Sequence, residues 1–162
     1  MKKKIIVIIV ICTVISFLLL NIIWFIFINI QYKPYEEIVP LTEQYGAPVY
    51  YRIDAENPNI QYGFDYPGYL QFESNLFYRE EFPEEKVSYS FIIWPRLFST
   101  PKYGVIIRQN EEEHQIELNE NMKVDEKDKG NEYAAQIIKE HEQELTPIFI
   151  EMKKTFNLKH EP

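Results

Sequence analysis

An uncharged stretch of apolar residues near the N-terminus is the strongest pattern in the chain. It runs from Ile5 to Ile30 and consists mainly of Ile, Val, Leu and Phe. A helix needs about 20 apolar residues to cross a bilayer core, whereas the apolar region of a cleaved signal peptide has about 7–15. The end of this stretch and the residues that follow, Asn29 to Tyr32, also lack the small residues of a cleavage site. We therefore expect an uncleaved transmembrane helix over residues 5–30, in contact with the lipid bilayer.

Lysines flank this stretch unequally. Three of them, at positions 2–4, precede the stretch, and only Lys33 follows it closely. The positive-inside rule then predicts a cytoplasmic tail over residues 1–4 and an extracytoplasmic location for the remainder. We expect Tyr32 and Lys33 to lie in the interfacial belt of a cell membrane.

Polar side chains interrupt the span, among them Thr13, Ser16 and Asn21. Such groups can hydrogen-bond to a partner helix. Since Ser16 and Asn21 do not lie on one helical face, we favour the alternative that the polar groups are simply tolerated, with Ser and Thr bonding to their own backbone.

The hydrophobic period changes to two after residue 48, which is typical of half-buried antiparallel strands. Six alternating runs predict a sheet over residues 49–121: 49–53, 60–66, 70–78, 87–93, 103–107 and 116–118.

The turns between these runs predict the strand register, because paired residues must share a face. A four-residue connection over 56–59 would place Arg52 opposite Gly63. A three-residue loop, Pro67-Gly68-Tyr69, would pair Tyr66 with Leu70 and give Gly68 a left-handed conformation. A four-residue loop over 110–113 would pair Ile107 with Ile116.

Helical spacing is found on both sides of the predicted sheet. Residues 31–48 predict a juxtamembrane linker with a short helix, broken at Pro40. A charged linker over 122–130 precedes a C-terminal helix over 131–158, in which Pro147 either kinks one helix or begins a second, capped by Thr146. The predicted fold is α+β: a transmembrane helix, then a small antiparallel meander of about six strands packed against a long C-terminal helix.

Composition narrows the range of cellular environments and of binding partners that fit this chain. The net charge of −8 becomes −11 for residues 31–162 once the three N-terminal lysines are left out. Acidity without basic clusters argues against nucleic acid. The single cysteine, Cys12, lies within the span, and no Asn-x-Ser/Thr sequon follows it. An extracytoplasmic domain without thiols or sequons suggests a bacterial protein.

Motifs for catalysis or metal binding are incomplete. His141-Glu142 resembles the start of a zinc-protease motif, but Leu145 stands where the second histidine is needed. Residues 125–130 have lysines where a calcium loop needs Asp or Asn. Ser88, Ser90 and Ser99 lack a nucleophile elbow. We therefore expect no enzyme, no metal and no cofactor.

Arginines are the first candidate binding residues. Alternation places Arg52, Arg79 and Arg108 on the polar face of the predicted sheet, where they could form an anion site. The alternative, which we favour, is pairing with acidic residues across the strands: Asp54, Asp65, Glu73 or Glu117.

An apolar patch near residue 94 is the second candidate. Ile92, Trp94 and Phe77 would point outward, and a Pro-Arg-Leu-Phe loop with Arg96 and Phe98 follows. Trp and Arg are common anchors at protein interfaces. The competing interpretation is that residues 34–46 cover this face and make it a second core.

These patterns predict a single-pass membrane protein with a small extracytoplasmic binding or accessory domain and a protein partner at the cell surface. An immunity or inhibitor protein that neutralises a toxin or hydrolase is the alternative, and a surface enzyme is less favoured.

Overall fold

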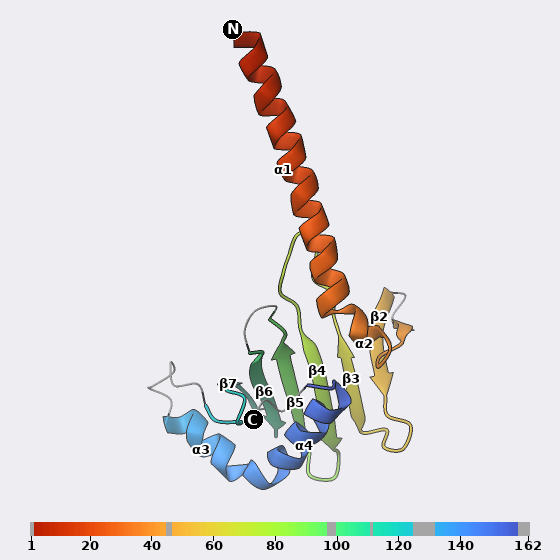
Figure 1. The fold of residues 1–162 in the computed structure, drawn as a ribbon. Helices are drawn as coiled ribbons and strands as arrows, with labels where there is room; N and C mark the ends of the chain where they lie inside the picture. Colours follow the sequence, from red (N-terminus) through yellow and green to blue (C-terminus); the bar gives the residue numbers. More distant parts are fainter. Residues whose placement is uncertain (1, 45–46, 97–99, 111, 125–131, 159–162) are drawn as a thin grey trace.

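In the computed structural model, a long N-terminal helix projects from a domain that consists of a seven-stranded sheet followed by two helices (Figure 1). The structure describes residues 2–44, 47–96, 100–110, 112–124 and 132–158. The helices are α1 (Lys2–Gln31), α2 (Lys33–Glu36), α3 (Glu132–Glu140) and α4 (Glu142–Thr155). The strands are β1 (Leu41–Gln44), β2 (Ala47–Ile53), β3 (Ile60–Phe64), β4 (Leu76–Phe82), β5 (Val87–Trp94), β6 (Lys102–Gln109) and β7 (Glu112–Leu118).

The strands form one open antiparallel sheet in sequence order. The expected meander is therefore confirmed, with one strand more than the six expected. C-terminal helices lie over one face of this sheet (Figure 1). There Phe149 of α4 packs against Phe91 and Tyr103, with ring centroids 5.3 and 5.4 Å apart. The core thus lies between α4 and the alternate side chains of the central strands.

One helix, Lys3–Gln31 within α1, is long and apolar enough to cross a membrane, a test that a signal sequence also passes. Its polar side chains bond to its own backbone: Thr13 donates to the carbonyl of Ile9, and Asn21 to that of Phe17. The bond of Thr13 to its own helix is the one that the sequence favoured, whereas the bond of Asn21 was not predicted.

The end of α1 belongs to the domain core. Phe27 is 3% exposed and Tyr32, which we expected among the interfacial residues, is fully buried. Tyr35 follows in α2 and contacts Phe64 of β3 and Phe156 beyond α4, with centroids 6.0 and 5.9 Å apart. The segment after the membrane helix therefore packs into the domain.

The described residues from Pro34 to Gln44 do not continue as the expected broken helix. Helix α2 has four residues, and β1 pairs with β2 from Leu41↔Tyr50 onward. Tyr35 and Val39 are buried on the helix-covered side of the sheet. The interpretation that this segment covers the patch near Trp94 is therefore wrong.

The β2–β3 register differs from the prediction by one residue. Arg52 pairs with Tyr62, not with Gly63. The Asp54 carboxylate accepts hydrogen bonds from the backbone of Glu56 and Asn57, at 2.8 and 2.9 Å. This local turn adds length to the connection, and a one-residue shift moves Arg52 to the helix-covered face.

The other two predicted turns are also wrong. Strands β3 and β4 are joined by a long loop, residues 65–75, whose base is closed by Phe64↔Leu76 and by the Asp65 amide donating to Asn75. The left-handed residue there is Leu70 (φ 60°), not Gly68. Between β6 and β7 the turn is tight, with Asn110 at φ 50° and Ile107 paired with His114.

The C-terminal region consists of two helices that meet at His141. The break lies before Pro147, which is inside α4, so neither alternative placed it correctly. His141 Nδ1 lies 2.9 Å from the hydroxyl of Tyr89 in β5. This contact ties the helix boundary to the sheet.

Candidate functional site: the open face of the sheet

One face of the sheet is formed by the side chains that point away from α4. Register places six residues in one line across it, each paired with the next: Tyr51, Gly63, Phe77, Ile92, Gly104 and Glu117. Tyr51, Phe77, Ile92 and the neighbouring Trp94 are all partly exposed, and we call these four the apolar row. A continuous apolar line on the solvent side of a sheet is suited to contact with another surface.

Glycines let the aromatic rings lie flat on this face. A Cβ at Gly63 would come within 2.7 Å of the Phe77 ring, and one at Gly104 within 2.9 Å of the Trp94 ring. The rings of Tyr51 and Phe77 are stacked, with centroids 6.2 Å apart and planes at 28°. The apolar row is therefore low in relief, and its rings are supported from below by backbone.

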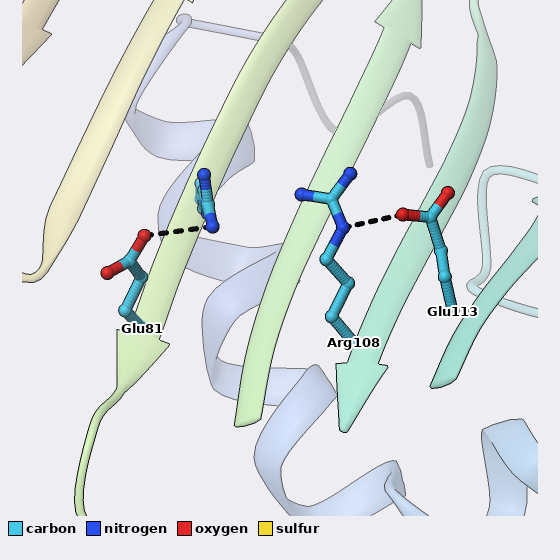
Figure 2. Close-up of polar contacts among 4 residues, drawn as sticks. Glu81, Arg108 and Glu113 are labelled. Carbon is cyan, nitrogen blue, oxygen red and sulfur yellow. Dashed lines mark hydrogen bonds and ion pairs between the residues drawn. The ribbon is translucent and has the colours of Figure 1, made fainter. Parts of the chain in front are cut away.

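Two arginines stand beside the apolar row, each held by a carboxylate. Arg79 of β4 pairs with Glu81 at 2.9 Å, and Arg108 of β6 pairs with Glu113 of β7 at 2.6 Å (Figure 2). Both arginines are thus paired, although not with the four acidic residues that we named. All four side chains are between 33% and 48% exposed, so solvent weakens these pairs and the groups stay accessible.

A shallow hollow of about 350 Å³ lies between the two arginines. Ser88 and Lys86 also line it. In the described part of the chain the Nε of Arg79 is buried and has no hydrogen-bond partner. This hollow therefore offers cationic groups and a hydroxyl to a ligand with acceptor atoms, beside the carboxylate of Glu81.

Two residues of the second candidate patch lie together. Trp94 and Arg96 line a hollow of about 210 Å³ together with Lys102, Glu73 and Glu117. Phe98 lies outside the described residues. The structure thus brings Arg79, Arg108, Trp94 and Arg96 to one face of the sheet.

Arg52 is separated from this group. It lies on the helix-covered side, where its Nη1 is 3.5 Å from the carbonyl of Ile38. Tyr51 takes its place on the open face, which the predicted register, shifted by one residue, did not indicate. Gly63 and Gly104 were a usable signal: each is a glycine at an outward position beside a large outward side chain of the next strand.

Titratable groups with shifted pKa values lie on the other side of the sheet. Burial raises the pKa of Tyr89 to about 12, and it raises the pKa of Glu80 above its usual range. These two residues pair with each other across β4 and β5, facing the helices. Among the described residues, no group of three His, Cys, Asp or Glu side chains is arranged to hold a metal ion.

No protein-family model matches the chain, and neither a curated protein nor a solved structure is significantly similar to it.

Proposed function

We propose that this protein is a single-pass membrane protein with its N-terminus in the cytoplasm, and that its extracytoplasmic domain binds a protein partner through the open face of the sheet. The anchor is α1, and Lys2 to Lys4 set its orientation by the positive-inside rule. The small α+β domain is the binding module.

The junction between helix and domain supports a permanent anchor. Phe27 and Tyr32 are buried in the core, and their rings contact each other at a centroid distance of 5.9 Å. Cleavage near residue 30 would remove Phe27 from this core and expose its neighbours. Burial of an aromatic side chain contributes about 3 kcal/mol, so retention of the helix stabilises the domain.

The apolar row is the observation that carries the binding proposal. Folded domains bury aromatic side chains where they can, yet Tyr51, Phe77 and Trp94 remain partly exposed on a low-relief surface. Aromatic anchors flanked by arginines are the composition of interface centres. Ion-paired Arg79 and Arg108 can exchange their intramolecular partners for carboxylates of a binding protein.

No flexible spacer separates α1 from the domain in the described residues, and this would limit how the open face can turn relative to the membrane. The amide of Tyr32 donates to Ile28 and that of Tyr35 donates to Tyr32, both at 2.9 Å, so hydrogen bonding continues from α1 into α2. The open face would therefore be held at a constant angle to the membrane, suited to a partner that is itself close to the membrane.

Site-specific photocrosslinking tests the proposal. A photoreactive amino acid replaces Ile92 in the full chain, in cells of the native host, with capture through a C-terminal tag. The matched control replaces Ile150, which is 51% exposed on α4, on the other side of the sheet. We expect one dominant adduct from position 92 that is absent from position 150.

Two results would contradict the proposal. The same adducts from both positions would show random collision, and adducts from position 150 alone would place the interface on the helices. A toxin or hydrolase as the dominant partner would identify the immunity or inhibitor role. Accessibility of the C-terminal tag to an impermeant protease tests the orientation separately.

A further inference from the structure

The β3–β4 loop lies against the membrane helix. Figure 1 shows this loop rising from the sheet alongside the lower part of α1. The indole Nε1 of Trp24 donates to the carbonyl of Gln71 at 3.0 Å, and the hydroxyl of Tyr69 donates to Oδ1 of Asn21. Ring contacts join Tyr69 to Trp24 and Phe72 to Phe27, at 5.3 and 5.2 Å.

The positions of Asn21 and Trp24 along α1 give the depth at which these contacts would lie in a bilayer. A helix rises about 1.5 Å per residue, so Asn21 lies about 26 Å and Trp24 about 30 Å along the axis from Lys4. The hydrocarbon core of a bilayer is about 30 Å thick. With Lys4 at one boundary, Asn21 and Trp24 reach the other, and the loop tip reaches it with them.

The loop has the composition of a membrane interface. Residues 66–72 carry no charge, and the acidic residues Asp65 and Glu73 stand at the two ends of this segment. Tyr69 is 60% exposed and Phe72 41%, although both already contact the helix. Tyr and Trp concentrate at the boundary of headgroups and acyl chains, where their apolar rings and polar tips are both satisfied.

We infer that residues 66–72 are a second membrane-contact element, which inserts Tyr69 and Phe72 into the outer interface of the bilayer beside α1. The inference rests on the proposed function, because it requires α1 to span a membrane. Its occupant is lipid: the uncharged tip avoids the repulsion that anionic headgroups exert on the acidic domain. The loop and α1 together would hold the sheet at two points.

Depth-dependent fluorescence quenching tests the inference. The full chain, with Cys12→Ser, receives one cysteine for a nitrobenzoxadiazole label and is reconstituted into phosphatidylcholine vesicles that contain spin-labelled lipids. The test position is Gln71→Cys in the loop. One control is Asn57→Cys, in the turn at the opposite end of β3, and the other is Leu18→Cys within α1.

We expect the label at position 71 to be quenched several-fold more strongly by a spin label near the headgroup than by one at mid-chain. The label at position 18 should show the reverse preference, and the label at position 57 should be unquenched. If the circular dichroism of the Gln71 variant differs from that of the parent chain, Phe72→Cys replaces it.

Each of the following outcomes overturns either the loop contact or the membrane span. Quenching at position 18 without quenching at position 71 overturns the loop contact and leaves the membrane anchor intact. Self-quenching at position 71 that rises with the protein-to-lipid ratio, without quenching by lipid, assigns the loop to contact with a second copy and also overturns it. An unquenched label at position 18 overturns the membrane span itself.

Discussion

The ring of Phe77 lies over the backbone of Gly63, its direct partner in the neighbouring strand. A Cβ on Gly63 would stand 2.7 Å from the ring and closer still to the carbonyl oxygen of Tyr50. Neither the backbone oxygen nor the partly buried ring can move away freely. The position accepts only glycine, and it holds one end of the apolar row.

Gly63→Ala should therefore destabilise the domain by roughly 1–3 kcal/mol, the usual cost of overpacking. Gly104→Ala is the matched control. Its Cβ would meet mainly the Trp94 ring, and the nearest backbone oxygen lies at 3.4 Å, so the ring can shift and the cost should be smaller. Urea unfolding of both variants in detergent micelles measures the difference, and equal stabilities would refute the packing argument.

A carboxylate joins the segment after α1 to the sheet. Oε1 of Glu36 accepts hydrogen bonds from the hydroxyls of Tyr66 and Tyr50, at 2.7 and 3.0 Å. The bond from Tyr66, and then that from Tyr50, lowers the pKa of Glu36. The ionised form is therefore the one that the folded state favours.

This lowered pKa predicts a dependence of stability on pH. A carboxyl group whose pKa falls on folding stabilises the protein above its unfolded value, about 4.3, and this contribution is lost as the pH falls through the lower folded value. Glu36→Gln should be less stable than the parent chain at pH 7, and the difference should shrink in that acidic range. Denaturant unfolding across the range measures it, with Glu37→Gln as the exposed control. A constant difference at all pH values would contradict the account.

Two phenylalanines near the end of α1 differ in whether they pack into the domain core. Phe27 is buried against Phe72 and Tyr32, whereas Phe25 is 63% exposed. Phe27→Ala should lower the free energy of unfolding of the domain by about 3–5 kcal/mol, the cost of a core cavity. Phe25→Ala should leave it unchanged, because that side chain faces outward. Near-ultraviolet circular dichroism during denaturation follows the domain, and equal effects of the two substitutions would separate α1 from the core.

The contact between Tyr89 and His141 predicts a smaller effect. Burial raises the pKa of Tyr89 to about 12, so the hydroxyl carries its proton at neutral pH, and it lies within hydrogen-bond distance of Nδ1 of His141. Tyr89→Phe should cost about 1 kcal/mol through the lost hydrogen bond. Tyr133→Phe, at an exposed site on α3, should cost little. Thermal unfolding of both variants makes the comparison, and an undiminished melting temperature for Tyr89→Phe would show that the bond does not stabilise the helix boundary.

The sequence predicted correctly those structural features that depend on a pattern repeated over many residues. Alternation over β4, β5 and β6 identifies their buried faces correctly, because each has a long run with bulky apolar residues on one side. The uncharged stretch from Ile5 likewise leaves no alternative to a long apolar helix. Each of these predictions depends on a pattern shared by many residues, so one misassigned residue does not change it.

The errors arose where one side chain decides the local structure. Asp54 accepts two backbone amides and lengthens a turn, which moves Arg52 to the other face and brings Tyr51 to the open one. Residues 66–72 alternate as a strand does, but Tyr69 and Phe72 pack on α1, a contact that no local pattern reveals. One position of the candidate site, Tyr51 in place of Arg52, thus depended on a register that the sequence did not determine.

The order of the strands has a consequence for how the chain is made. Because every strand pairs only with its neighbours in sequence, the growing polypeptide can build the sheet one strand at a time after α1. The face that bears Phe91 is covered by Phe149 of α4, which is made only after all seven strands. Folding during synthesis therefore includes an interval in which a nearly complete sheet presents its apolar side to water, and the arrival of α4 ends it.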